Sequence, residues 1–199
     1  ALPAVRYASF TSDQCRSELQ ARGIAHAEVR KHATIDAPVT LQGALRGVRF
    51  EFVHAAPGVS QKDVLDCRLL LALDDLAKIL AARDIDLVRY NSIYRHGWAR
   101  GRVQGHLGGV AIDIVEFVKH DGTLLNVRTD FAGDGIGSAT CGDRAKPARA
   151  GKASELRDLV CSVDQARIFN LLLTPHYDRR HFNHFHFEVR RGIRWFLTQ

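Results

Sequence analysis

The stretch HFNHFHFEV, residues 181–189, places three histidines within six positions and alternates two of them with phenylalanine. In an extended strand, successive side chains point to opposite faces, so His184, His186 and Glu188 share one face. The phenylalanines and the valine between them form the other face, which is apolar. The pattern predicts a strand with one packed and one ionisable face. An amphipathic strand whose polar face lies in water would look the same, so the rest of the chain must decide.

The composition of the chain is that of one folded domain, or of a domain with a modest N-terminal extension. Its 199 residues are 46% hydrophobic and 25% charged, which is enough apolar surface for a core of ordinary size. We place the extension at residues 1–58 and the main domain at residues 59–199, and we expect a monomer. No run of about 18 apolar residues occurs, so no membrane span is expected.

The charge pattern weighs against nucleic acid as a partner. The formal net charge is +6 and the isoelectric point about 9.4. However, Lys and Arg are scattered, and aromatic residues are not interleaved with them as on base-stacking surfaces. A basic surface equally favours another polyanion, such as a bacterial cell wall, because long-range attraction does not distinguish among polyanions. Charge alone therefore selects no partner.

Four cysteines stand far apart, at Cys15, Cys67, Cys141 and Cys161. No C-x-x-C pair occurs, which argues against a cysteine zinc site or a redox pair. An even number suits two disulfides, for which three connectivities are possible. We favour Cys15–Cys67 and Cys141–Cys161, since each would tie an apparent helix to a neighbouring segment. The alternative is four buried free thiols in a cytosolic protein. Because the chain has no methionine, we also expect that a leader was removed.

Helices and strands are mixed without a regular βαβ order, so we expect an α+β fold, an antiparallel sheet with flanking helices. The strongest helical pattern, over residues 63–84, predicts the main core helix. A second helix is predicted over residues 153–173, ended by Pro175. The other expected elements are an extended arm over 1–10, a short helix over 11–23, β-rich pieces within 26–55, strands over 85–94, 110–118 and 123–131 with a turn at Asp121-Gly122, a Gly-rich loop over 132–151, and the closing strand over 184–189.

Asp113 holds the informative position, because it lies inside the otherwise apolar strand VAIDIV. An inward carboxylate must be paired, hydrogen-bonded or bound to a metal, since its burial alone is costly. Gly105, Gly108 and Gly109 would let the loop fold back and bring His106 to the same place. With a third ligand, a His from the closing strand, this would be a site of the catalytic zinc type. The alternative is an ion pair of Asp113 with an arginine, and His106 as a loop residue.

The spacing His106-x6-Asp113, followed near the C-terminus by His184-x-His186, resembles the signature of the LAS zinc peptidases. This group includes D-Ala-D-Ala metallopeptidases, murein endopeptidases and the hedgehog signalling domain. The resemblance implies that His106, Asp113 and His186 bind Zn2+. The longer motif His181-x-x-His184-x-His186 is similar to that of the penicillin-insensitive murein endopeptidases.

The sequence around these motifs resembles the bacterial extensin-like C-terminal family, which belongs to the same group. The helix DCRLLLALDDLAKIL, the strand AIDI and the ending HFNHFHFEV are similar to that family, over about residues 60–190. The resemblance implies a LAS or hedgehog-like zinc peptidase core in the main domain. It also implies a secreted or periplasmic bacterial protein whose partner is a peptidoglycan peptide.

Zinc with three protein ligands lowers the pKa of bound water to about 7 and polarises a peptide carbonyl. Hydrolysis then needs a base for the water proton and a donor for the oxyanion. His184 shares a strand face with His186 and suits one of these roles. His181 lies on the approach to the strand and suits the other. Glu188 is expected to support the site or to form a surface salt bridge.

The segment NSIYR, residues 91–95, resembles the Ser-x-Tyr-Arg segment that helps hold the substrate carboxylate in related peptidases. We therefore expect Ser92, Tyr94 and Arg95 to bind substrate. Arg95 suits this task because its planar fork grips a carboxylate in two places. The alternative for Arg95 is a solvated side chain at a strand end.

Together, these residues and this resemblance predict a zinc metallopeptidase, a peptidoglycan hydrolase that cleaves cross-links or stem peptides. The bond stays open between DD- and LD-endopeptidase and carboxypeptidase types. The alternative is a non-catalytic, zinc-stabilised domain that binds cell wall or protein without cutting. A basic wall-binding module without a metal is the third candidate.

Overall fold

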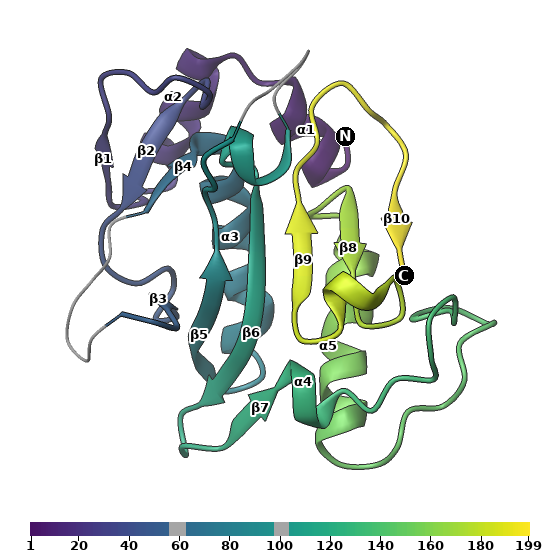
Figure 1. Cartoon of the computed structure of the whole chain (residues 1–199). Coiled ribbons are helices and arrows are strands. Elements are labelled where there is room, and N and C mark those ends of the chain that lie inside the picture. The colour runs from purple at the N-terminus through teal and green to yellow at the C-terminus, as the bar shows by residue number, and fades with distance from the viewer. Residues whose placement is uncertain (56–62, 98–103) are drawn as a thin grey trace.

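The structure of the protein, a computed structural model, describes residues 1–55, 63–97 and 104–199 (Figure 1). Helices and strands are mixed along the chain, which confirms the predicted α+β class. A seven-stranded sheet forms the main body, and a three-stranded sheet lies beside it. The expected boundary between residues 58 and 59 lies outside the described residues.

The helices are α1 (Pro3–Ser9), α2 (Ser12–Ala21), α3 (Cys67–Ala81), α4 (Val127–Asp130) and α5 (Lys152–Ala166), with the short 3-10 helices η1 (Gly105–Gly108) and η2 (Arg179–His181). The main sheet contains β3 (Arg49–Phe52), β5 (Ile85–Ser92), β6 (Ala111–Lys119), β7 (Leu124–Asn126), β8 (Leu171–Leu173), β9 (Phe185–Glu188) and β10 (Leu197–Thr198). The small sheet contains β1 (His26–Glu28), β2 (Pro38–Leu41) and β4 (Val64–Asp66), in the order β1-β2-β4.

The main sheet has the order β10-β8-β9-β6-β5-β3, with β7 also paired to β6. Its centre is antiparallel, as predicted, because β5, β7 and β9 all run opposite to β6. The edges differ, since β3 is parallel to β5 and β10 is parallel to β8. Strand β6 is therefore the central strand on which the pairing of the sheet converges.

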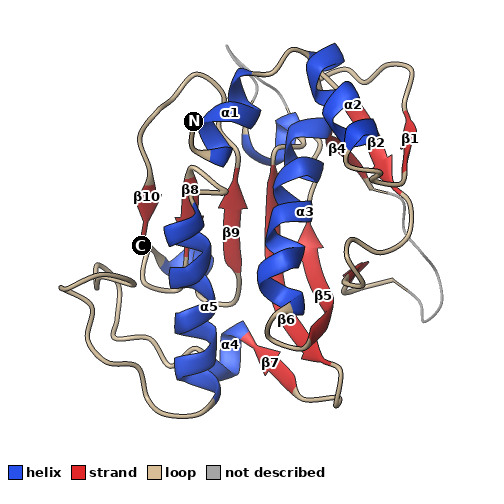
Figure 2. Cartoon of the chain, turned by 180° about the vertical axis from the view of Figure 1, so that it is seen from behind, coloured by secondary structure: helices blue, strands red, loops and turns tan. Residues whose placement is uncertain are grey.

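Helices α3 and α5 lie side by side over one face of the main sheet (Figure 2). Phe185 and Phe187 of β9 belong to the core between these helices and the sheet. Because side chains alternate along a strand, His184 and His186 point to the opposite face. The predicted division of the closing strand into an apolar and an ionisable face is confirmed.

Helix α3 begins later than predicted, at Cys67 rather than at Asp63. Residues Val64–Asp66 form β4 instead, because they pair with β2 in the small sheet. The Asp66 side chain then caps the helix by accepting a hydrogen bond from the backbone N–H of Arg68 at 3.0 Å. The fully buried Arg68 guanidinium also pairs with the Asp66 carboxylate, at 2.8 Å.

The predicted extended arm over residues 1–10 is wrong, because Pro3–Ser9 form α1. Proline is favourable in a first helical turn, because its fixed φ suits a helix and the backbone N–H that it lacks would have no acceptor within the helix. Ala4 and Tyr7 lie on the buried face of α1, which packs against α3. Packing against a distant helix, rather than local propensity, stabilises so short a helix.

Helix α5 ends seven residues earlier than predicted. Arg167 adopts a left-handed backbone conformation, with φ of 51°, directly after Ala166. The following Leu171–Leu173 then form β8, which pairs with β9. A short apolar run can be buried in a helix or in a strand, so periodicity alone did not separate the two.

Of the predicted strand over residues 123–131, only Leu124–Asn126 are strand. The strand ends at Asn126, whose side-chain oxygen accepts hydrogen bonds from the backbone N–H groups of Arg128 and Thr129. This cap starts α4 in place of further strand. The predicted short helix and the predicted β-rich pieces before residue 55 are present as α2 and β1 to β3.

Both favoured disulfides are present. One joins Cys15 of α2 to Cys67 at the start of α3, and the other joins Cys141 of the Gly-rich loop to Cys161 of α5. All four cysteines are therefore paired. Within the described part of the chain, no helix is long and apolar enough to cross a membrane.

We expect loss of the Cys15–Cys67 bridge to cost more stability than loss of Cys141–Cys161. The first spans 52 residues and the second 20, and the entropy of loop closure then predicts about 4 and about 3 kcal/mol. Urea unfolding of the two double Cys→Ser variants would measure both free energies. An equal or reversed ranking would show that native contacts, rather than unfolded-chain entropy, set the contribution of each bridge.

Candidate metal centre

The carboxylate of Asp113 lies at the centre of a cluster of nitrogen atoms. Asp113 is the third residue of β6 and is only 1% exposed. The register of the sheet places Ser92 of β5 beside it on one side and His186 of β9 on the other. Arg95, His106 and His186 contact the Asp113 carboxylate and cover it from solvent.

The loop before β6 brings His106 to the same place, as the glycines predicted. Gly105 and Gly109 flank His106 with φ of 58° and 64°, which is left-handed backbone that favours glycine. A Cβ at Gly109 would also lie 2.8 Å from Ile35 Cδ1. The folded-back turn puts His106 Nε2 3.0 Å from Asp113 Oδ1.

The three predicted metal ligands are brought together. His186 Nδ1 lies 2.9 Å from Asp113 Oδ1, the same oxygen that faces His106. Possible ligand atoms of His106, Asp113 and His186 all lie within 4.8 Å of one another. Two imidazole nitrogens and a carboxylate oxygen form a donor set that suits a divalent metal ion.

The second ring nitrogen of each histidine is held by an acceptor. His106 Nδ1 is 3.0 Å from the carbonyl oxygen of Ile93, and His186 Nε2 is 3.4 Å from Glu188 Oε2. When these nitrogens donate, a neutral ring has its lone pair on the other nitrogen, and that nitrogen faces the Asp113 carboxylate. Lone pairs that meet in this way need a proton or a cation between them, and metal-binding histidines are commonly held in the same manner.

Glu188 is held in place behind His186, which fits its predicted role as a support of the site. It is 1% exposed and accepts hydrogen bonds from Arg190 Nε at 2.9 Å and from the backbone N–H of Gly105 at 3.1 Å. Burial raises the pKa of Glu188, but its contacts with His186 and Arg190 outweigh burial and lower it. Glu188 therefore stays ionised and supports both candidate histidine ligands.

His184 and His181 both lie beside this cluster. His184 Nε2 is 3.4 Å from Asp113 Oδ1, and burial lowers the pKa of His184 to about 4, despite the attraction of that carboxylate. The ring centroid of His181 is 5.1 Å from that of His184 and 5.8 Å from that of His186. The predicted catalytic pair thus adjoins the candidate ligands.

The predicted substrate-binding residues divide into two groups. Arg95 contacts Asp113 Oδ2, and its Nε donates to Ser92 Oγ at 2.8 Å. Tyr94 instead contacts the rings of His32 and His96, at 4.6 and 5.0 Å. The predicted alternative of an ion pair between Asp113 and an arginine thus exists in addition to the histidine contacts, because the two oxygens of Asp113 face different partners.

Two contacts in the cluster were not anticipated from the sequence. The carbonyl of Ile93 carries no side-chain signal at all, since any residue could supply it. Asp178 Oδ1 lies 2.7 Å from His181 Nδ1. An Asp three positions before a His is the only sign of this contact in the sequence, and it also fits an ordinary turn cap.

Opposite charges attract one another within the cluster. Burial raises the pKa of Asp113, but hydrogen bonds from His106 and His186 outweigh burial and hold it far below its usual range. Burial likewise lowers the pKa of His186, but its contacts with Asp113 and Glu188 outweigh this and raise the pKa to about 9. A proton on His186 therefore takes the place that a cation would take.

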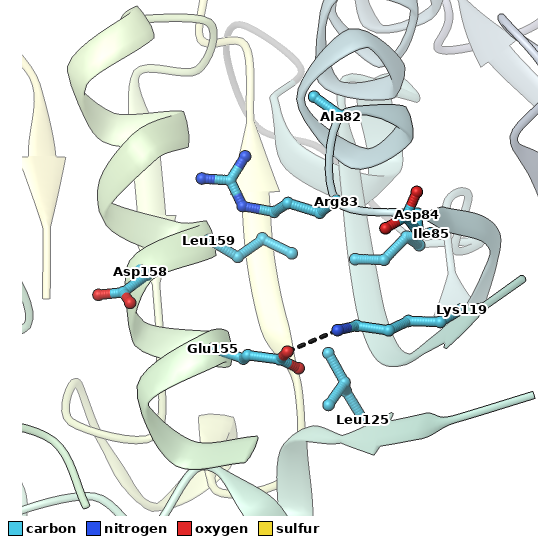
Figure 3. A pocket seen from close by; sticks show the side chains of 9 residues that line it. All are labelled: Ala82, Arg83, Asp84, Ile85, Lys119, Leu125, Glu155, Asp158 and Leu159. Carbon is cyan, nitrogen blue, oxygen red and sulfur yellow. Dashed lines mark hydrogen bonds and ion pairs between the residues drawn. The ribbon is translucent and has the colours of Figure 1, made fainter. Parts of the chain in front are cut away.

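A pocket of about 510 Å³ opens at the other end of the main sheet, between the end of α3 and α5 (Figure 3). Lys119 and Glu155 form an ion pair across it, and Ile85, Leu125 and Leu159 line it. It contains no histidine and none of the predicted site residues. The pocket is thus separate from the candidate metal centre.

Comparison with protein families gives one match of nearly the whole chain. Residues 13–197 match the family described as Extensin-like protein C-terminus. The match begins in α2 and ends in β10, so it includes the small sheet, the main sheet and all three candidate ligands. No curated protein and no solved structure matches the chain.

We expect the metal-free protein to bind one equivalent of Zn2+, and variants His106→Ala, Asp113→Ala and His186→Ala to lose this binding. Three protein ligands are the usual set of an open zinc site, so removal of one leaves too few. Zn2+ titration against a chelator would measure the affinity. His120→Ala, in an exposed turn, is the matched control, and Asp113→Asn tests the ligand with less risk to the fold. Full affinity in the His186 variant would remove that histidine from the ligand set.

We also expect Zn2+ binding to release about one proton at neutral pH. The raised pKa of His186 means that its proton stabilises the metal-free fold below pH 6.5, and this contribution is lost as pH rises through about 9. The ion must displace that proton to reach the imidazole. Calorimetric titration in two buffers with different ionisation enthalpies would count the protons. No proton release near neutral pH, or equal release above pH 9, would contradict the assignment.

Proposed function

The chain belongs to the family of extensin-like protein C-terminal domains, and on this premise we propose that it is a zinc-dependent peptidase of peptidoglycan. One observation carries the proposal. Each candidate ligand histidine has one nitrogen held by an acceptor, while its other nitrogen is aimed at the same buried carboxylate oxygen. An arrangement of this kind needs a proton or a cation between the nitrogens and the oxygen, and it is the arrangement common to metal-binding histidines.

The residues of the chain fit zinc in type and in placement. His106 Nε2, His186 Nδ1 and Asp113 Oδ1 would hold the ion, and three protein ligands leave room for a further one. When bound, zinc supplies Lewis acidity that polarises a carbonyl and brings the pKa of water to about 7. Arg95 covers the second oxygen of Asp113, so one carboxylate oxygen is left for the ion.

His181 and His184 would perform the proton chemistry. The Nε2 of His181 accepts a proton from water and returns it to the amide nitrogen that leaves. His184 Nε2 lies 3.4 Å from Asp113 Oδ1, and in the tautomer with hydrogen on Nε2 it would donate to the developing oxyanion. Its pKa of about 4 keeps the His184 imidazole neutral at physiological pH.

Arg95 is the residue we assign to the substrate. Its side chain is 55% exposed and starts from the loop after β5, while its guanidinium reaches the candidate metal ligands. A free carboxylate on a peptidoglycan stem peptide would find a cation there. Ser92 holds the Arg95 side chain from behind.

We further propose that the protein acts as a monomer outside the cytosol, in the periplasm or as a secreted protein. Two disulfides persist in oxidising compartments and are rare in the cytosol. The net charge of +6 would hold the protein near an anionic wall. The pairing of all four cysteines is the observation that favours this location.

Purified sacculi separate the proposal from the second candidate, a zinc-stabilised domain that binds without cutting. We expect the zinc-loaded protein to release muropeptides and the chelated protein to release none. Fragment analysis would also tell endopeptidase from carboxypeptidase cleavage. Binding to sacculi without release of any fragment would favour the binding domain.

We expect His181→Ala or His184→Ala to keep zinc and fold and yet to slow hydrolysis by about 100-fold or more. This is the usual contribution of an acid–base group or of an oxyanion donor. Rate profiles against pH should show an acid limb, because a base must be neutral to accept a proton. If both variants cleaved at the wild-type rate, the proposed mechanism would fail.

A further inference from the structure

We propose that Asp178 is a positioning residue, which fixes the ring orientation and the tautomer of His181 so that Nε2 presents a lone pair to the reaction. This inference rests on the proposed function for its role in hydrolysis. It concerns η2, the short helix that leads into β9 (Figure 1). The contact between the two side chains is the observation that carries it.

Within the described residues, the three side-chain contacts of Asp178 converge on one oxygen. Oδ1 accepts hydrogen bonds from the backbone N–H of Arg180 at 2.8 Å and of His181 at 3.2 Å, and it lies 2.7 Å from His181 Nδ1. A carboxylate oxygen held by two N–H donors can only accept. The imidazole must therefore donate from Nδ1, and a neutral His181 has its lone pair on Nε2.

The rest of the ring environment leaves Nε2 available. The His181 ring is packed by Tyr177 at 5.3 Å and by His184 at 5.1 Å between centroids, and its side chain is only 15% exposed. Among the described residues, none forms a hydrogen bond with Nε2 of His181. The ring is thus held at one end by Asp178 and is free at the other, beside the ligand His186.

A turn cap alone would not need this contact. Asp121 caps the β6–β7 turn in the same way, accepting from the backbone N–H of Thr123 at 2.8 Å, and among the described residues no imidazole contacts that oxygen. Asp178 performs the capping and also holds the ring. Asp121 therefore shows that an aspartate of this protein can cap a turn without holding a histidine ring.

The role in the reaction follows from the tautomer. Water loses a proton to His181 Nε2 as its oxygen bonds to the peptide carbonyl carbon. The carbon–nitrogen bond then breaks, and the proton on Nε2 passes to the leaving amine. A ring with hydrogen on Nε2 cannot accept the first proton, so Asp178 would keep His181 in the form that can react.

Two substitutions divide capping from positioning. Asp178→Ser keeps a capping oxygen but is too short to reach the ring. Asp178→Asn must turn its oxygen toward the same two backbone N–H groups, so it still accepts from Nδ1. Asp121→Ser is the matched control for loss of a capping carboxylate elsewhere, and zinc content is measured for each variant.

In hydrolysis of sacculi, we expect Asp178→Ser to lower kcat by about 10-fold or more with little change in KM. Asp178→Asn should keep more than a third of kcat, and Asp121→Ser should match the wild type. In a His181→Ala background, Asp178→Ser should cost less than about 2-fold, because the residue acts through that ring. Full kcat in Asp178→Ser, or an undiminished loss in the double variant, would overturn the inference.

Nitrogen-15 NMR of His181 gives a readout that is independent of activity. We expect hydrogen on Nδ1 in the wild type and in Asp178→Asn, and a shift toward hydrogen on Nε2 in Asp178→Ser. An unchanged tautomer in Asp178→Ser would overturn the inference. If the wild type failed to hydrolyse sacculi, the proposed function would fail and the catalytic role of Asp178 with it, while this spectrum would still decide the tautomer.

Discussion

A carboxylate buried in the middle of a sheet is the constraint on which the rest of the site depends. Asp113 is almost fully buried in the central strand, where an unpaired charge would be very unfavourable. Nitrogen atoms of His106, His184, His186 and Arg95 therefore gather around its two oxygens. These come from three separate parts of the chain, so neutralising one charge fixes the relative positions of a loop, a strand and a turn.

The candidate ligands could be predicted from the sequence because their chemistry allows few residue types. An aspartate inside an apolar strand has to be neutralised, and the alternating histidines of the closing strand had to share one face. Glycines around His106 indicated a loop that could fold back. The core helix was equally clear, since its apolar residues recur at helical spacing over many turns. Each of these predictions rested on one physical rule and on a sequence pattern that was long or unusual.

The remaining features depend on contacts that a local pattern does not contain. Helix α1 is stabilised by burial of Tyr7 against a distant helix, and the start of α3 is set by pairing of residues 64–66 with another strand. The support of His106 comes from the Ile93 carbonyl, which any residue could supply. Asp178 was missed for a related reason, because a short polar residue before a turn is common without any partner.

The order of the candidate ligands along the chain governs when the centre can form. His186 follows Asp113 by 73 residues and lies in β9. At about 5–20 residues per second, the ribosome would release Asp113 roughly 4–15 s before its partner. Until then β6 lacks β9 as a neighbour, and only two of the three ligands exist. Any chemistry that needs all three side chains must therefore wait until the segment that contains β9 has been made.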